Sequence, residues 1–115
     1  MSEEHPIFDR EGAFDRVEND KELYFELYDM FFEDLPHQID QIREDVSQSE
    51  SKNLEMHAHA IKSALGNIGA MSAYHLAYTL ERLGKAGQLG EAKGVFERLC
   101  EEIDKFRIEA GRERP

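Results

Sequence analysis

The strongest constraint on the fold is a set of apolar residues near the C-terminus that recur at spacings of three and four. The set consists of Leu89, Ala92, Phe96, Leu99, Ile103 and Phe106. Because an α-helix advances about 3.6 residues per turn, this spacing places the whole set on one helix face, which must be buried. Alternating polar and apolar runs of β-branched residues, which would predict strands, are nearly absent. The sequence therefore predicts an all-α fold.

Two helices are predicted in the first part of the chain. A short one follows Asp9, a possible N-cap, and a long one begins near Asn19, which precedes a glutamate by three positions. We expect the long helix to continue to about Val46, with a kink or local break near Pro36, because the apolar residues before and after this proline point about 100° apart. The core-facing residues expected before the proline are Leu23, Leu27, Met30 and Phe31.

Two further helices are predicted between this long helix and the last one. The first runs from about Ser51 to about Ile68, because Gly69 can take the left-handed conformation that ends a helix. The second is capped by Ser72 and stops between Gly84 and Gly87. Four amphipathic segments joined by short connectors predict an antiparallel up-down-up-down four-helix bundle, with the short N-terminal helix covering one end. We expect one domain over residues 1–115, with frayed ends at 1–6 and 109–115.

Composition excludes several classes of function. The net charge of −11 disfavours binding to nucleic acids and to anionic membrane surfaces. The single cysteine, Cys100, cannot form an intramolecular disulfide, which suits a reducing compartment. No apolar run approaches the roughly 20 residues of a membrane span, and the first residues lack the pattern of a signal peptide. We therefore expect a cytoplasmic protein that does not enter the membrane.

His59 lies opposite the apolar face of its predicted helix. That face is formed by Leu54, Ala58, Ile61, Ala64, Leu65 and Ile68. On a helical wheel, Lys62, Ser63 and Gly66 lie within about 60° of His59, so the imidazole is expected to face solvent beside a cation and two small residues. Lysine can contact a phosphoryl oxygen but does not help to bind a metal. The pattern indicates an imidazole that another molecule approaches.

Other kinds of site find little support. His57 and His59 point roughly 160° apart on a helix, so they cannot share a metal ion, and no Glu-x-x-His pattern of a di-metal bundle occurs. We expect no metal site, and a structural role for His57 as a partly buried imidazole with a hydrogen-bond partner. No Gly-rich phosphate loop, nucleophile elbow or kinase signature is present. The chemistry that remains is nucleophilic attack by a neutral imidazole on an activated phosphoryl group.

Residues 58–64 (AHAIKSA) and 67–70 (NIGA) resemble the histidine phosphotransfer (HPt) domain family of multistep two-component phosphorelays. The family pattern is His, any residue, a large aliphatic residue, Lys, Gly, small residues and an aliphatic–Gly pair. Ser63 stands where the family commonly has Gly. The resemblance covers nearly the whole chain and implies the same bundle.

The resemblance implies that His59 accepts a phosphoryl group from a phospho-aspartate of a receiver domain and passes it to another receiver domain, while Lys62 stabilises the phosphoryl oxygens. The implied partners are response-regulator receiver domains, a hybrid histidine kinase, or both, and the Mg²⁺ would be bound by the receiver. The chain itself would then be a monomeric phosphocarrier without a cofactor, rather than an enzyme. The expected docking residues are Met56, Ser63, Gly66 and Asn67.

Two alternatives to this function remain open at the level of sequence. An HPt-like bundle could bind a receiver or kinase domain without being phosphorylated, and the serine at position 63 is the best support for this alternative. A helical bundle of unrelated function would have to place His59 beside Lys62 by accident. Tyr28 and Phe32, which are four residues apart, either pack beneath the short first helix or form an exposed patch for a partner, and packing is the expectation.

Overall fold

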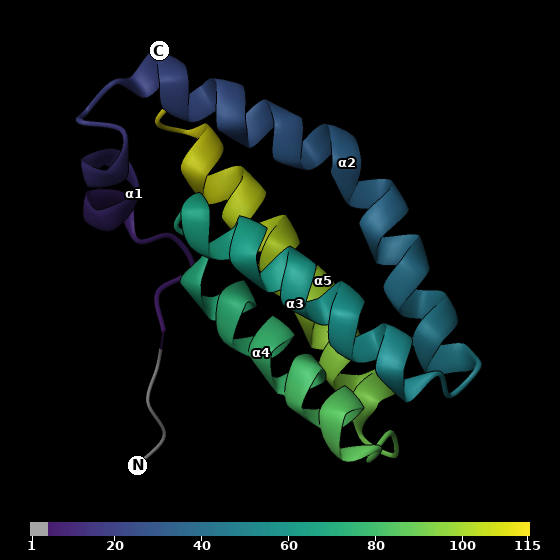
Figure 1. Ribbon diagram of the computed structural model, residues 1–115. Coiled ribbons are helices and arrows are strands. Elements are labelled where there is room, and N and C mark those ends of the chain that lie inside the picture. The colour runs from purple at the N-terminus through teal and green to yellow at the C-terminus, as the bar shows by residue number, and fades with distance from the viewer. Residues whose placement is uncertain (1–4) are drawn as a thin grey trace.

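The structure is a computed structural model that describes residues 5–115. Its helices are α1 (Arg10–Arg16), α2 (Lys21–Ser47), α3 (Ser51–Asn67), α4 (Met71–Ala86) and α5 (Ala92–Gly111). Helices α2 to α5 run alternately up and down and form a four-helix bundle, and α1 lies across one end of it (Figure 1). The predicted all-α bundle with a short N-terminal helix is therefore confirmed.

The first two helices begin where the sequence predicts. The side chain of Asp9 accepts a hydrogen bond from the Gly12 backbone amide at 3.2 Å, and Asp20 accepts one from Leu23 at 3.0 Å. Asn19 precedes the cap of α2 in a turn and has a φ of 62°. Asp20, and not Asn19, therefore satisfies a free amide of the first turn of α2.

The predicted buried face of α2 is partly wrong. Leu23, Leu27 and Met30 are 40%, 37% and 59% exposed, and of the predicted set only Phe31 is buried. The other buried side chains in this half of the helix are Tyr24, Phe25 and Tyr28. These aromatic residues also recur at helical spacing, and each buries more apolar area than a leucine or methionine, so the aromatic face packs inward.

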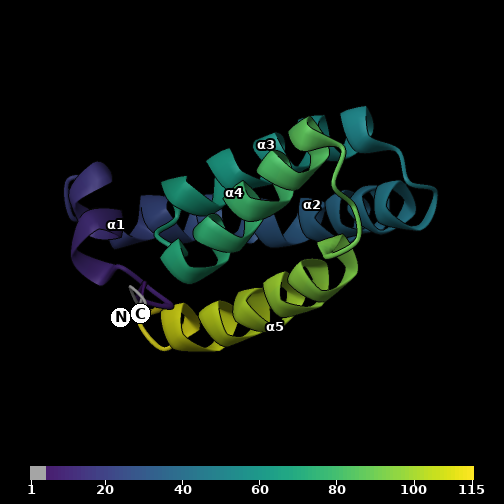
Figure 2. The same ribbon diagram turned by 90° about the horizontal axis from the view of Figure 1, so that it is seen from below.

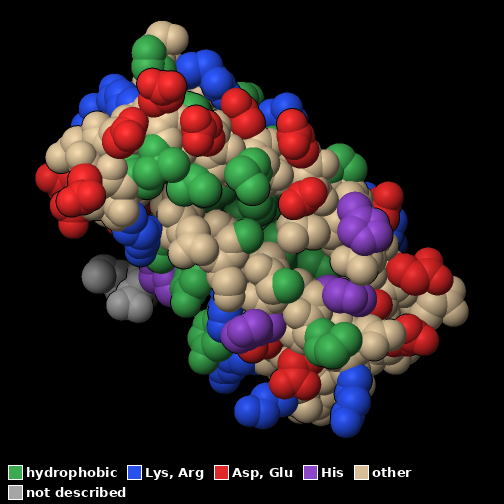
Figure 3. Space-filling view, turned by 45° about the horizontal axis from the view of Figure 1, so that its top comes forward, with side chains coloured by type: hydrophobic (Ala, Val, Ile, Leu, Met, Phe, Trp, Pro, Cys, Tyr) green, Lys and Arg blue, Asp and Glu red, His purple; other side chains and the backbone are tan. Residues whose placement is uncertain are grey.

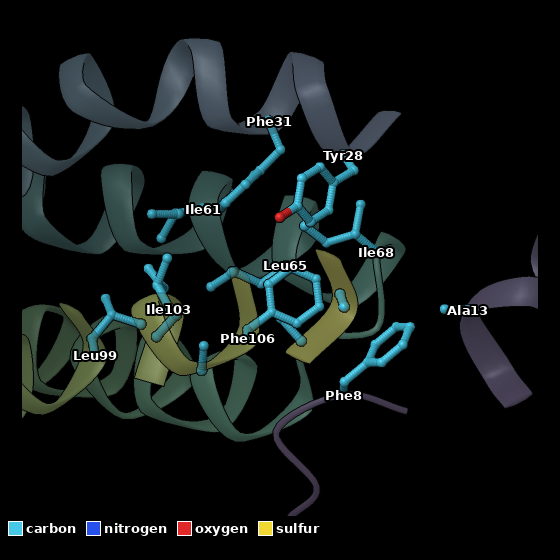
Figure 4. Packing of buried hydrophobic residues seen from close by; sticks show 14 of the residues in the cluster. Phe8, Ala13, Tyr28, Phe31, Ile61, Leu65, Ile68, Leu99, Ile103 and Phe106 are labelled. Atoms are coloured by element: carbon cyan, nitrogen blue, oxygen red, sulfur yellow. The ribbon is translucent and has the colours of Figure 1, made fainter. Parts of the chain in front are cut away.

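Tyr28 and Phe32 pack as expected, but against α5 and not beneath α1. The Tyr28 hydroxyl donates a hydrogen bond to the Arg107 carbonyl at 2.7 Å. The Phe32 ring stacks on Phe106, with ring centroids 6.2 Å apart, and Figure 4 shows Phe106 among the buried residues of the bundle. Tyr24 takes the place beneath α1, where its ring contacts Phe14.

Helix α2 continues through Pro36 without a break. Its ribbon changes direction along its length (Figure 1). A proline inside a helix removes one backbone donor and crowds the preceding turn, which a bend relieves. The kink predicted near Pro36 is therefore present as a bend of α2, and the alternative prediction, a local break, is wrong.

Helices α3 and α4 pack with their backbones in close approach. A Cβ atom built on Gly84 would lie 2.7 Å from the backbone nitrogen of Glu55 and 2.8 Å from the carbonyl oxygen of Ser51. The turn between the helices contains Gly69, whose φ of 83° favours glycine. The expectation that Ser72 caps α4 is wrong, because Ala70 is the N-cap residue and the Ser72 hydroxyl donates to Glu102 of α5.

The end of the chain is held more firmly than expected. Helix α5 extends to Gly111, so the predicted fraying from residue 109 is wrong. Beyond the helix, Glu113 forms ion pairs with Arg10 at 3.0 Å and Lys21 at 3.2 Å, and Arg114 pairs with Asp29 at 2.5 Å. These contacts tie the C-terminal segment to α1 and α2.

The expectation of a frayed N-terminal segment over 1–6 falls partly on residues 1–4, which lie outside the described residues. The carbonyl of Pro6 accepts a hydrogen bond from the Ser72 amide at 2.9 Å, so this residue is held against α4. Within residues 5–115, none of the helices is both long enough and apolar enough to cross a membrane.

Candidate functional site

His59 lies in the middle of α3, on the face that points away from the core. Its side chain is 60% exposed, whereas Ala58 and Ile61 beside it are fully buried. The neighbours pack into the bundle because they belong to the apolar stripe, and the imidazole is left on the opposite side of the same helix. The predicted solvent-facing imidazole is therefore confirmed.

Glu81 of α4 joins His59 to Lys62. One carboxylate oxygen, Oε2, lies 2.8 Å from Nδ1 of His59, and the other, Oε1, lies 2.7 Å from Nζ of Lys62. Lys62 is also positioned over the ring of Tyr78, with Nζ 5.1 Å from the ring centroid. Its side chain is only 15% exposed, so the ammonium lies against α4 and is less free than the helical wheel suggests.

The charges at this site stabilise one another. Partial burial raises the pKa of Glu81, but hydrogen bonding with Lys62 and His59 outweighs this effect, so the pKa of the carboxyl lies below its usual range. The contact with Glu81 in turn raises the pKa of Lys62 despite some desolvation. At neutral pH the site therefore holds an ionised carboxylate and a protonated ammonium.

The contact of Glu81 with His59 and Lys62 does not follow from the periodicity of either helix alone. A helical wheel treats α3 and α4 separately, and the two residues meet only because the helices pair in antiparallel fashion. The turn at Gly69 carries the usable signal, because residues at similar distances before and after a tight helical turn lie side by side. His59 lies ten residues before Gly69 and Glu81 twelve residues after it.

The predicted docking residues lie on two parts of this face. Met56 is exposed and lines a shallow depression together with Lys52, Glu55, His59 and Glu81. Ser63 and Asn67 are exposed further along α3. The Ser63 hydroxyl donates to the backbone carbonyl of His59 at 3.2 Å, so it lies along the helix and adds little bulk.

Gly66 has a different environment from the one expected. A Cβ atom at this position would lie 3.1 Å from the ring of Tyr74 on α4, and the Gly66 carbonyl accepts a hydrogen bond from Arg16 at 2.8 Å. The absence of a side chain at Gly66 therefore leaves space for the Tyr74 ring. It does not enlarge the exposed surface beside the His59 imidazole.

An apolar groove runs between α2 and α3 on the same side as Ser63 and Asn67. This α2–α3 groove has a volume of about 340 Å³. It is lined by Val17, Leu27, Met30, Phe31, Ala64 and Ile68, and its polar edge is formed by Arg16, Asp34, Gln38 and Asn67. Figure 3 shows apolar side chains gathered on this face of the molecule, bordered by acidic ones.

His57 is a partly buried imidazole with a hydrogen-bond partner, as the sequence predicts. Its Nδ1 lies 2.5 Å from Oδ2 of Asp45, a buried residue of α2. The pair satisfies a carboxylate that would otherwise be buried without a partner. Over residues 5–115, no group of three or more His, Cys, Asp or Glu side chains is arranged to hold a metal ion.

The family comparison gives an independent assignment. The sequence model of the Hpt domain matches residues 26–109, about three quarters of the chain, and this span includes His59, Lys62 and Glu81. The chain belongs to the Hpt domain family. Hpt domains are phosphocarriers that typically transfer a phosphoryl group through a histidine in phosphorelays.

The fold of this Hpt domain matches a solved structure of the same kind. Histidine-containing phosphotransfer protein B (HptB) from Pseudomonas aeruginosa PAO1 superposes with a TM-score of 0.86 at 23% sequence identity, over 96% of each chain. This similarity covers the short N-terminal helix and the four helices of the bundle. Among curated proteins, none matches the chain.

Proposed function

We propose that this Hpt domain is a phosphorelay intermediate that accepts a phosphoryl group on His59 from a phospho-aspartate of one receiver domain and passes it to another. The observation that carries the proposal is the exposed imidazole in the middle of α3, with Glu81 at Nδ1 and Lys62 within the same ion-paired cluster. The free nitrogen, Nε2, is available as the nucleophile.

The proposed reaction requires little from this chain beyond a nucleophile and positive charge. Nε2 forms a bond to phosphorus, the bond from phosphorus to the aspartate oxygen breaks, and the aspartate carboxylate leaves. Lys62 lies one turn from His59 and stabilises the phosphoryl oxygens by moving part of its contact away from Glu81. The receiver domain supplies Mg²⁺, and this chain needs no cofactor of its own.

The partner must cover more than the imidazole. A stable interface buries about 800 Å² on each partner, which corresponds to a patch roughly 30 Å across. A receiver domain centred on His59 therefore covers Met56, Ser63 and Asn67, with Gly66 contributing only backbone at the edge. On the α4 side it would meet the charged pair of Glu81 and Lys62, whereas on the α2 side it meets the apolar groove.

The α2–α3 groove therefore supports the docking of a receiver domain that presents an apolar ridge bordered by basic residues. Leu27 and Met30 are large apolar side chains that the bundle leaves exposed, and Asp34 lies at the groove edge. Burial of the exposed apolar area favours association. Because Arg16 at the same edge is held by the Gly66 carbonyl, Asp34 and the acidic side chains around the groove in Figure 3 favour a basic partner surface. We propose that the domain acts as a monomer in the cytoplasm, and that the receiver domain belongs to a response regulator or to a hybrid histidine kinase.

The deciding experiment is transfer of labelled phosphate from a phosphorylated receiver domain. Wild type should acquire an acid-labile label, and His59→Gln should acquire none while unfolding at nearly the same temperature, because an exposed side chain contributes little packing. His37→Gln, which removes an exposed histidine of α2, is the matched control and should retain the label. Label on the His59→Gln protein would show that another residue accepts the phosphoryl group. A wild-type protein that binds the receiver but takes no label would be a binding module only.

A further inference from the structure

The surface around His59 carries opposite charges on its two sides. On the α2 side, residues 22–42 contain acidic residues but no lysine or arginine, and acidic side chains border the α2–α3 groove (Figure 3). On the α4 side, the exposed charged residues are Arg82 and Lys85. The one acidic residue of α4, Glu81, is only 18% exposed and is paired with side chains of α3. The surface is therefore acidic over α2 and basic over α4.

Tyr78 and Arg82 form an exposed pair on α4, which we call the α4 patch. They are four residues apart, so they lie on the same face of the helix. Tyr78 is 44% exposed, and the guanidinium carbon of Arg82 lies 5.7 Å from the centroid of its ring. Within residues 5–115, no carboxylate forms an ion pair with Arg82, so its N–H groups can bind another molecule.

The α4 patch adjoins the candidate site directly. Nζ of Lys62 lies 5.1 Å from the centroid of the Tyr78 ring and 2.7 Å from Oε1 of Glu81. The other oxygen of this carboxylate contacts the ring of His59. A partner that covers His59 with an interface of about 800 Å² therefore also covers the α4 patch.

The residue types of the α4 patch are those that dominate the binding energy of protein interfaces. Tyrosine brings a large apolar ring with few torsions to fix, and arginine forms two-point contacts with carboxylates. The partner in the proposed function presents a phospho-aspartate beside a Mg²⁺ site, and Mg²⁺ is bound through carboxylates. The reactive surface of such a partner is therefore acidic, and the α4 patch is complementary to it in charge.

We propose that the α4 patch binds acidic residues at the rim of the receiver domain's phosphorylation site and thereby fixes the orientation in which the receiver docks. This inference rests on the proposed function and adds the side of the interface opposite the α2–α3 groove. A receiver turned by half a rotation about His59 would bring its acidic rim over the acidic residues of α2. Like charges would then face each other, which disfavours that orientation.

The test titrates each full-length variant with the Mg²⁺-bound receiver domain of a response regulator at about 0.05 M and about 0.5 M salt. Arg82→Glu should raise the Kd about 10-fold at the lower salt concentration and less than about 3-fold at the higher one, because salt screens exposed charges. Arg98→Glu makes the same change in charge at an exposed position of α5 and is the matched control. An unchanged Kd in Arg82→Glu, or an equal rise in both variants, would overturn the proposal.

A charge swap tests the orientation. Asp34→Lys, at the edge of the groove, should also raise the Kd, because it places a cation against the basic side of the partner. The double variant Asp34→Lys/Arg82→Glu has the net charge of wild type but should bind more weakly than either single variant. Binding as tight as that of wild type would show that only net charge matters, and would refute the fixed orientation.

Tyr78 is tested by two substitutions. Tyr78→Ala should raise the Kd about 10-fold, whereas Tyr78→Phe, which keeps the ring, should bind nearly as wild type does. Loading of His59 from phosphoramidate, which needs no docking surface, should be unchanged in both variants. Slower loading of Tyr78→Ala at an unchanged Kd would show that Tyr78 acts through Lys62 and is not a docking residue. Thermal unfolding confirms that each variant is folded.

The outcomes also separate this inference from the proposed function. A wild-type protein that binds the receiver and takes up phosphate, together with an Arg82→Glu variant of equal affinity, would overturn the role of the α4 patch alone. A wild-type protein that binds the receiver but takes up no phosphate would overturn the proposed function, and the Kd values would still decide whether the α4 patch is part of the interface.

Discussion

Truncation of Met30 to alanine tests whether the α2–α3 groove is the docking surface. Met30 is 59% exposed in the free domain, and complete burial of a methionine side chain contributes about 1.5–3 kcal/mol. If a receiver domain covers the remaining exposed area, Met30→Ala removes about 1–2 kcal/mol of binding free energy, which corresponds to a Kd about 5- to 30-fold higher. The stability of the free domain should change little, because the side chain is mostly in solvent.

The assay is isothermal titration of each variant with the receiver domain. Ile108→Ala is the matched control, because Ile108 is 62% exposed on α5, which lies on the far side of the bundle from α3 in Figure 2. It should leave the Kd unchanged. Loading of His59 from a small donor such as phosphoramidate should be the same in both variants, because such a donor needs no docking surface. Unchanged receiver binding in Met30→Ala, or an equal loss in Ile108→Ala, would refute the placement of the partner on the groove.

Three further predictions concern transfer and stability. Lys62→Ala should slow transfer from a receiver by roughly 10- to 100-fold in quenched-flow measurements, since a charge-assisted contact contributes about 1.5–3 kcal/mol; an unchanged rate would remove Lys62 from the reaction. Ser63→Gly should lower stability by about 0.5–1 kcal/mol with a modest effect on transfer, whereas Ser63→Arg should block docking; fast transfer by the arginine variant would mean that the partner does not cover this part of α3. Gly84→Ala should lower the free energy of unfolding by about 1–3 kcal/mol in urea, because its Cβ would overlap the backbone of Glu55; wild-type stability would show that α3 and α4 separate without cost.

Helical periodicity was sufficient to predict the features that depend on a single helix. The apolar stripe around Ala58 and Leu65 fixed which side of α3 is buried, and it therefore fixed the exposure of His59. The boundaries near Asp9, Asp20 and Gly69 followed from local capping chemistry, which acts within one turn.

Features that depend on the packing of two helices could not be predicted from helical periodicity. Helix α2 carries an aliphatic set and an aromatic set at helical spacing, and only packing against α5 decides that Tyr28 is buried while Met30 is exposed. The position of Glu81 depends on the register of α3 against α4. The anchoring of Glu113 depends on Arg10 and Lys21, which are remote in sequence and are brought together by the closed bundle.

Gly84 allows α3 and α4 to lie close together, because a side chain at this position would meet the backbone of α3. Its contact with Glu55 lies one turn from His59 on α3, and Glu81 lies three residues before Gly84 on α4. A hydrogen bond of 2.8 Å to the ring tolerates only a few tenths of an ångström before it weakens. The absence of one methyl group, in a residue with no charge and no contact with the imidazole, thus sets how closely the Glu81 carboxylate of α4 lies against the His59 ring of α3.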